Sequence, residues 1–135
     1  MSKKFNSLKT GVIGVGSMGK NHARIYNDIS NLVGVSDLNK DQGNEIASSY
    51  NCNFYSNYRE LLDNVDAVTI AVPTTFHERV SIDALEKSVH VLVEKPLSHD
   101  VESSISIVEQ ARHNNLKLAV GHIEQHNPII KKIKK

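Results

Sequence analysis

The sequence has little of what disulfide-bonded, zinc-binding and membrane-spanning proteins need. Its single cysteine, Cys52, excludes an internal disulfide and a zinc site built from several thiolates. No run of apolar residues approaches the roughly 18 that a membrane span requires. The first ten residues carry charges but no apolar stretch of the signal-peptide kind. We therefore expect a cytoplasmic protein, with Cys52 as an inert thiol because no basic residue adjoins it in sequence.

An excess of charge of one sign is also lacking. Sixteen lysine and arginine residues against fifteen acidic residues give a net charge of +1. Four of the positive charges lie in the last five residues, so the rest of the chain carries a net charge of −3. Because no basic stripe covers the body of the chain, nucleic acid is not an expected partner. The length of 135 residues is that of one domain, covering residues 1–135.

Short apolar runs rich in β-branched residues alternate with segments whose apolar residues recur at helical spacing. The runs predict strands buried on both faces, and the segments between them predict amphipathic helices. The expected strands are 12–15, 32–35, a weak strand at 54–55, 67–72, 91–93 and 118–120. Helix starts are predicted at Asn39, Asn57 and Thr75, each three residues before Gln or Glu, and at Asp100.

This alternation predicts an α/β fold with right-handed crossovers. We expect a doubly wound parallel sheet of the Rossmann type, with six strands in the order 3-2-1-4-5-6 and five full helices. In such a sheet, ligands bind beyond the carboxyl ends of the strands, next to the point where the strand order reverses.

A glycine-rich turn, Gly14-Val-Gly16-Ser-Met-Gly19, joins the first expected strand to a helix. This context provides a tight turn, an unobstructed backbone beside a pyrophosphate, and a helix N-terminus that attracts its charge. Asp37 ends the second strand 18 residues after Gly19, where a carboxylate can accept both adenosine ribose hydroxyls and repel a 2′-phosphate. The pattern favours NAD over NADP. The alternative interpretation is that these residues bind no ligand and form only a glycine-rich turn followed by an aspartate that caps a loop.

Two later segments fall at the same expected edge. The loop Val72-Pro73-Thr74 and the nearby His77 could contact the cofactor, although His77 could equally be a helix residue without a ligand. The segment Glu94-Lys95-Pro96 ends the fifth strand, where the Lys95 side chain can hydrogen-bond a substrate hydroxyl and favour its alkoxide character. Taken alone, a Glu-Lys-Pro segment could also be a connecting loop with a salt bridge.

The last strand leads into a segment that contains His122, Glu124 and His126. A metal site is not expected there, because the two histidines share a face only in a helix, and Pro128 disfavours one. No chemistry is assigned to the remaining histidines, which are His22, His90, His99 and His113.

Four motifs occur in order, each at a strand end. They are Gly11–Gly19 with His22, Ala71–Thr74 with His77, Val91–Leu97, and Val120–His122 with Asn127-Pro128. Together they resemble the nucleotide-binding half of the Gfo/Idh/MocA oxidoreductases over residues 8 to 130. Within that family, Gly-His-Ile-Glu followed by Asn-Pro is most similar to UDP-N-acetylglucosamine 3-dehydrogenases and related sugar-nucleotide oxidoreductases.

The resemblance implies an NAD-dependent dehydrogenase that acts on a sugar or sugar nucleotide, with Lys95 as catalytic residue and no metal. The implied cofactor-binding residues are Gly14, Gly16, Ser17, Met18, Gly19, Asp37, Val72, Pro73, Thr74, His77, Glu94 and Lys95. The implied substrate-side residues are Lys95, His122 and Asn127. A non-catalytic NAD-binding or sensing module is the alternative. A methyltransferase using S-adenosylmethionine would explain neither the Glu-Lys-Pro segment nor the spacing through Gly19.

This chain departs from the family pattern in two ways, and both limit which family properties can be assigned to it. Relatives usually have Arg-Phe where this chain has Gln125-His126, so no role is predicted for these two residues. Family members are also much longer, because a second α/β domain covers the nicotinamide, forms much of the sugar pocket and supplies the acid/base. We expect that domain to be absent from these 135 residues and to act in cis or in trans. We also expect the chain to be inactive alone and to form oligomers only in a full-length form.

Overall fold

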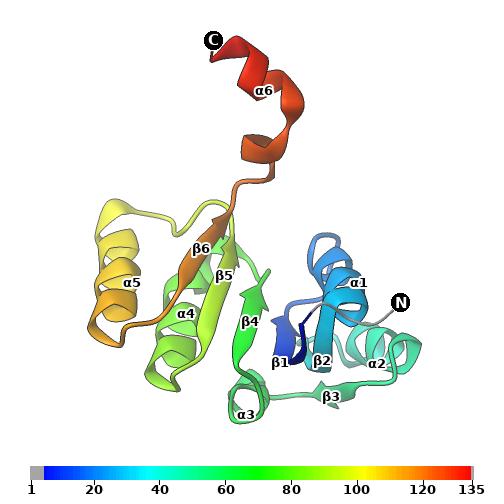
Figure 1. Cartoon of the computed structure of the whole chain (residues 1–135). Helices are drawn as coiled ribbons and strands as arrows, with labels where there is room; N and C mark the ends of the chain where they lie inside the picture. The colour runs from blue at the N-terminus through cyan, green and yellow to red at the C-terminus, as the bar shows by residue number, and fades with distance from the viewer. Residues whose placement is uncertain (1–4, 135) are drawn as a thin grey trace.

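The computed structural model describes residues 5–134 as one parallel sheet with helices packed against it (Figure 1). The strand order is β3-β2-β1-β4-β5-β6, and every neighbouring pair is parallel, which confirms the predicted Rossmann topology. The strands are β1 (Phe5–Ile13), β2 (Ser30–Ser36), β3 (Asn53–Tyr55), β4 (Ala67–Ile70), β5 (His90–Glu94) and β6 (Leu118–Gly121).

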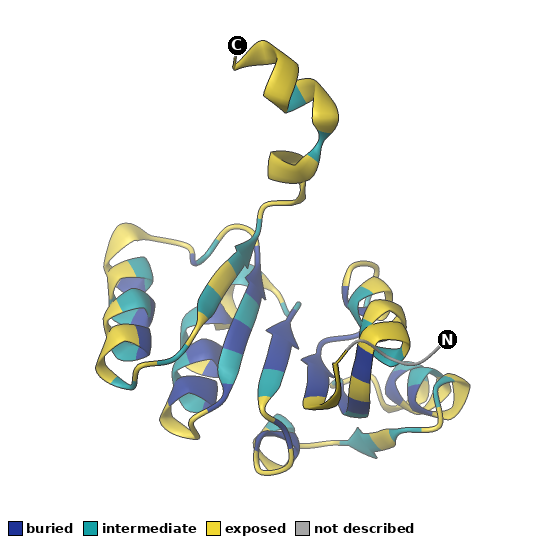
Figure 2. Ribbon diagram, in the orientation of Figure 1, coloured by how far each residue is buried: buried dark blue, intermediate teal, exposed yellow. Residues whose placement is uncertain are grey.

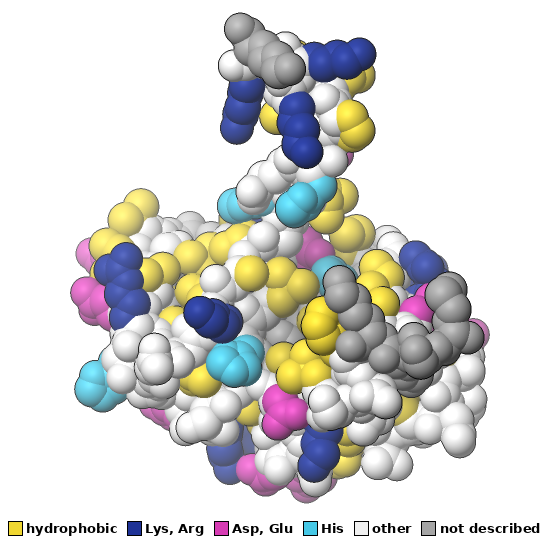
Figure 3. Space-filling view, in the orientation of Figure 1, with side chains coloured by type: hydrophobic (Ala, Val, Ile, Leu, Met, Phe, Trp, Pro, Cys, Tyr) yellow, Lys and Arg dark blue, Asp and Glu magenta, His cyan; other side chains and the backbone are white. Residues whose placement is uncertain are grey.

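The connections between strands are helical. The helices are α1 (Gly19–Ile29), α2 (Lys40–Ser49), α3 (Tyr58–Leu62), α4 (His77–Glu86), α5 (Val101–His113) and the short α6 (Pro128–Ile133), with 3-10 turns η1 (Thr74–Phe76) and η2 (Ile123–His126). After β6 the chain projects from the sheet through η2 and α6, and Figure 2 shows this projection as almost wholly exposed. Lysine side chains gather on this projecting segment (Figure 3). Lys131 and Lys132 lie in the last turn of α6. Within residues 5–134, no helix is long and apolar enough to cross a membrane.

Two apolar clusters pack on opposite faces of the sheet. Alternate residues of a strand point to opposite faces, so Ile13 joins one cluster and its neighbour Val12 joins the other. The larger cluster includes residues of α3, α4 and α5, and the smaller one includes residues of α1 and α2. The sheet is therefore covered from both sides, as a parallel sheet requires.

Three differences from the expected strands stand out. Strand β1 runs from Phe5 to Ile13, whereas the expected strand was 12–15; its first five residues are exposed and show no continuous apolar run. Strand β4 ends at Ile70, so Ala71 and Val72 belong to a loop at the carboxyl edge. Strand β6 is not buried on both faces: it lies at the edge of the sheet, and Ala119 is exposed.

Two of the first three predicted helix caps are confirmed. The Asn39 side chain accepts a hydrogen bond from Gln42 N at 3.1 Å, as predicted for α2. Asn57 caps α3, but its partner is Arg59 N at 3.0 Å, one residue earlier than expected. The prediction at Thr75 is wrong, because this residue lies inside η1 and α4 begins only after that turn.

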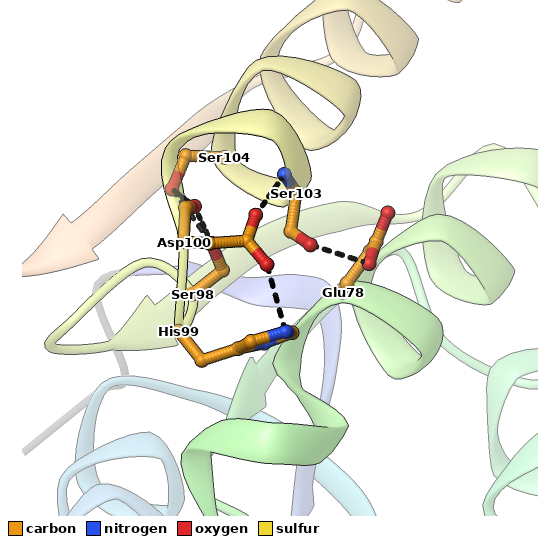
Figure 4. Close-up of polar contacts among 6 residues, drawn as sticks. All are labelled: Glu78, Ser98, His99, Asp100, Ser103 and Ser104. Carbon is orange, nitrogen blue, oxygen red and sulfur yellow. Dashed lines mark hydrogen bonds and ion pairs between the residues drawn. The ribbon is translucent and has the colours of Figure 1, made fainter.

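Asp100 caps α5 as predicted, and it lies within a larger polar network (Figure 4). Its Oδ1 accepts a hydrogen bond from Ser103 N at 2.7 Å, and its Oδ2 lies 2.8 Å from Nε2 of His99. The Ser103 hydroxyl donates to Glu78 Oε2 at 2.7 Å, which links α5 to α4. In the described part of the chain, no serine hydroxyl is hydrogen-bonded to His99. The cluster therefore caps a helix and is not a catalytic triad.

The capping role of Asp100 predicts a pH-dependent loss of stability. The hydrogen bond from Ser103 N lowers the pKa of the Asp100 carboxyl below its usual value of 3.8. A carboxyl with a depressed folded-state pKa stabilises the fold above its unfolded pKa, and that contribution is lost as the pH falls through the folded pKa. We expect Asp100→Ala to lower the thermal midpoint at neutral pH and the difference to shrink below pH 3.8. Circular dichroism melts across this range provide the measurement.

A matched control for this prediction is Glu109→Ala, which removes an exposed carboxylate from the same helix. This control should change the thermal midpoint little at any pH. A destabilisation by Asp100→Ala that persists undiminished at low pH would show that the cap does not depend on the ionised carboxylate.

Candidate cofactor and active site

The three glycines of the turn after β1 have different surroundings. Gly14 has a φ of +86°, and a Cβ there would lie 2.6 Å from the Ala71 carbonyl oxygen. A Cβ at Gly19 would lie 1.7 Å from the Gly14 carbonyl oxygen. At Gly16, by contrast, a Cβ would meet nothing within 4 Å. The first and third glycines are therefore required by the packing of the chain itself, and Gly16 faces open space.

A groove of about 550 Å³ lies at the carboxyl edge beside this turn. Five of the residues predicted from the sequence line it, namely Gly14, Gly16, Asp37, Val72 and Pro73. Eleven other lining residues were not predicted, among them Leu38, Tyr58, Arg59, Phe76 and Arg79. Leu38 and Phe76 are exposed apolar side chains, and such side chains in a groove mark binding surfaces, but only the structure shows that they are exposed.

The Asp37 carboxylate both organises the turn and retains free acceptor capacity. Its Oδ2 accepts a hydrogen bond from Val15 N at 2.8 Å, and its Oδ1 accepts one from Asn39 N at 2.7 Å. A carboxylate has about four acceptor positions, so two remain for further donors. Asp37 thus ties the glycine turn to the end of β2 without exhausting its capacity to bind hydroxyls.

The start of α1 is suited to an anion. No side chain caps this helix, and its first turn carries no acidic residue. The backbone N–H groups and the positive end of the helix dipole therefore meet no protein carboxylate there. Together with the open space at Gly16 and the acceptors of Asp37, these features fit the pyrophosphate and the adenosine ribose of NAD.

One wall of the groove is held by a polar cluster around Tyr58. Its hydroxyl donates to Asp83 Oδ2 at 2.5 Å, and desolvation together with this bond raises its pKa to about 12. The Arg59 guanidinium lies 4.9 Å from the centre of the Tyr58 ring and 2.8 Å from Asp83 Oδ2. Tyr58 is therefore a neutral phenol that holds the wall in place.

His77 lies beneath the site and does not line the groove. Its side chain is among the largest that are fully buried, and the residue is 1% exposed. Its Nε2 lies 2.9 Å from the Val72 carbonyl oxygen, and its Nδ1 lies 2.8 Å from the Pro96 carbonyl oxygen. Both ring nitrogens thus face protein carbonyls, so His77 joins two loops in this structure, and its direct contact with a cofactor stays a prediction.

Glu94 is also engaged by the protein. The residue is 8% exposed, and its Oε1 lies 2.6 Å from Nε2 of His22. A Cβ at Gly121 would approach the Glu94 carboxylate to 2.9 Å, so the neighbouring strand β6 leaves room for it only because it carries glycine. In this structure the Glu94 carboxylate pairs with His22, and its contact with a cofactor stays a prediction. No chemistry is predicted for His22 from the sequence. Its position one turn after Gly19 was the sequence feature that could have pointed to a role at the sheet edge.

The other predicted residues do not line the groove. Lys95 is exposed directly after β5, and within residues 5–134 its side chain has no hydrogen bond or ion pair. Ser17, Met18 and Gly19 form the start of α1, and Thr74 begins η1. Those predicted for the substrate side, His122 and Asn127, lie on the projecting segment after β6.

The projecting segment is largely held by its own contacts. Asn127 caps α6 through a bond from Ile129 N at 3.0 Å and donates to Glu124 Oε2 at 3.0 Å. Gln125 and His126 are exposed within η2. In the described range, no group of three His, Cys, Asp or Glu side chains could hold a metal ion. Burial raises the pKa of the Cys52 thiol to about 11, which agrees with an inert cysteine.

Known proteins share this fold and these motifs. UDP-N-acetylglucosamine 3-dehydrogenase from Acidithiobacillus ferrooxidans is 41% identical over 123 residues, which are 91% of this chain and 39% of that protein. A solved structure of that enzyme has a TM-score of 0.90 at 39% identity and matches 94% of this chain and 42% of its own. Inositol 2-dehydrogenase from Corynebacterium glutamicum (strain R) is 35% identical over 136 residues, covering 96% of this chain and 40% of that protein.

A further solved structure, a protein of gentamicin A biosynthesis in complex with NAD, has a TM-score of 0.84 at 27% identity and matches 89% of this chain and 36% of its own. The chain thus spans about two fifths of the length of the relatives it matches. The family model described as "Oxidoreductase family, NAD-binding Rossmann fold" matches residues 8–122. Since that match covers most of the chain and ends directly after the edge strand β6, the chain belongs to the Gfo/Idh/MocA oxidoreductase family and forms its NAD-binding Rossmann domain.

Proposed function

We propose that this domain serves an NAD-dependent dehydrogenase that oxidises a hydroxyl of a sugar or sugar nucleotide resembling UDP-N-acetylglucosamine. The observation that carries the proposal is the position of an unpaired Lys95 at the same sheet edge as the cofactor groove. The names of the similar relatives, a UDP-N-acetylglucosamine 3-dehydrogenase and an inositol 2-dehydrogenase, support the substrate class.

The groove suggests how each part of the cofactor would be held. Asp37 would accept the adenosine ribose hydroxyls, and Leu38 and Phe76 offer apolar side chains for the adenine ring. The pyrophosphate would lie over Gly16 at the start of α1. The loop at Val72 would flank the nicotinamide end, where bound NAD⁺ would accept a hydride.

Lys95 would act on the substrate oxygen. Its ammonium group can donate a hydrogen bond to the reacting hydroxyl and stabilise the negative charge that grows on the oxygen as hydride leaves the carbon. The hydroxyl proton must pass to a base, and the reacting carbon must be held about 3 to 3.5 Å from its acceptor. We propose that the second α/β domain of the family, in cis or in trans, supplies that base and completes the pocket, with His122 and Asn127 on the substrate side.

The proposal is tested by an activity assay on the completed protein, either full-length or combined with a complementary C-terminal half. UDP-N-acetylglucosamine, myo-inositol and glucose 6-phosphate are each supplied with NAD⁺, and NADH formation is followed by absorbance. We expect the highest rate with UDP-N-acetylglucosamine. A preference for inositol would contradict the proposed substrate, and NAD binding without turnover of any sugar would favour a sensing module.

Asp37 provides a separate test of cofactor choice. We expect Asp37→Ala to weaken NADH binding by about 1.5 to 3 kcal/mol, the usual contribution of hydrogen bonds to a charged group. The variant should also narrow the preference for NADH over NADPH, because it no longer repels the 2′-phosphate. Titration calorimetry with both cofactors measures each effect.

Comparing NADH with NADPH also distinguishes the loss of ribose recognition from damage to the glycine turn. Loss of the bond to Val15 N would weaken NADH and NADPH binding alike, whereas loss of the ribose contact changes their ratio. If the unmutated chain binds NADPH as well as NADH or better, Asp37 does not select the cofactor.

A further inference from the structure

Two histidines hold the residues on either side of Lys95. The Glu94 carboxylate lies 2.6 Å from Nε2 of His22, and the Pro96 carbonyl oxygen lies 2.8 Å from Nδ1 of His77. Lys95 itself is exposed, and in the described chain its side chain has no polar partner. The backbone around Lys95 is therefore anchored on both sides, while its ammonium group stays available.

The first anchor connects Lys95 to the helix that begins at the glycine turn. The His22 and Glu94 side chains are only 16% and 10% exposed. An ionised Glu94 can only accept, so His22 Nε2 donates, and this charge-assisted bond is shielded from water. The anchor spans 72 residues of sequence and joins α1 to the end of β5.

The second anchor connects Lys95 to the loop after β4. His77 opens α4, and its ring bridges the Pro96 carbonyl to the Val72 carbonyl, which lies on the cofactor groove. The ring is buried, and an apolar side chain in its place would leave both carbonyls without this partner. The His77 ring therefore ties the loop that lines the groove to the loop that carries Lys95.

We propose that His22 and His77 are positioning residues for Lys95, and that they connect its placement to the two segments that hold the cofactor. The inference rests on the proposed role of Lys95 in the dehydrogenase. A side chain that acts on a reacting oxygen must be held to about 0.5 Å, and lysine has a long flexible stem, so its backbone must be fixed by neighbours. Neither histidine touches the substrate in this arrangement.

Nuclear magnetic resonance of the ¹⁵N-labelled chain tests the proposal through the backbone amide of Lys95. In the unmutated chain we expect one sharp Lys95 signal that shifts when NADH is added. In His22→Leu and in His77→Leu we expect this signal to broaden or divide and its response to NADH to be lost, although NADH still binds. His22→Gln, which keeps a donor for Glu94, should recover the original signal.

His113→Leu is the matched control, because it removes an exposed histidine of α5 that has no side-chain partner in the described chain, and it should leave the Lys95 signal unchanged. Leucine variants that keep both the sharp signal and its NADH response would overturn the positioning roles. If His77→Leu does not fold, His22→Leu and its glutamine rescue decide the question. If NADH binds the unmutated chain but never shifts the Lys95 signal, the proposed role of Lys95 fails, while the signals without NADH still test the two anchors.

Discussion

Gly16→Val is expected to abolish NADH binding while leaving the sheet and its helices intact. A Cβ at Gly16 would meet nothing within 4 Å, so we expect the fold itself to tolerate a side chain there. The same side chain would occupy the space in which the pyrophosphate approaches the backbone at the start of α1. NADH fluorescence titration should show no binding, and far-UV circular dichroism should show an unchanged spectrum.

The neighbouring glycine provides the matched control. Gly19→Ala places a methyl group 1.7 Å from the Gly14 carbonyl oxygen, so it should lower the thermal midpoint as well as binding. The pair separates a residue that the ligand requires from one that the fold requires. Normal NADH binding by Gly16→Val would place the pyrophosphate elsewhere on the domain.

Lys95→Ala in the completed enzyme is expected to lower the rate of NAD⁺ reduction by about 100-fold or more, the usual effect of removing one group that stabilises charge in the transition state. The affinity for NAD should change little, because the adenosine and pyrophosphate contacts are made by other residues. Lys87→Ala removes an exposed lysine that pairs with Asp63 and does not line the groove, so it should retain full activity. A fully active Lys95→Ala enzyme would remove Lys95 from the mechanism.

The 135-residue chain by itself should give no measurable turnover of UDP-N-acetylglucosamine or free sugars. Its edge offers Lys95 and the cofactor groove, but among the described residues that line this groove there is no His or Glu, and Asp37 is assigned to the ribose, so none of them is left as a base for the substrate proton. Adding a complementary C-terminal half should restore NADH formation. Robust NADH production by the isolated chain would show that the pocket is already complete.

Local patterns in the sequence were sufficient for the topology and for five of the sixteen residues that line the groove. Strand and helix periodicity depend on neighbouring residues, so the six strands and their order could be predicted before any contact was known. The glycine turn and Asp37 could be predicted for a similar reason, because a strand, a tight turn and a helix follow one another along the chain. Thr75 shows where this fails: a capping pattern predicted a helix start, but the chain forms a 3-10 turn there.

What the sequence by itself determined was therefore the Rossmann fold, the glycine turn and Asp37 that line the groove, and the presence of Lys95 at the same sheet edge. Only the tertiary structure decided which of the polar residues at that edge are free. His22 meets Glu94 across 72 residues, and His77 meets Pro96 across 19, and no local pattern encodes such pairs. They form because parallel strands bring their carboxyl ends to one edge, where the packing of α1 and α4 buries both histidines against β5 and its loop and leaves Lys95 exposed.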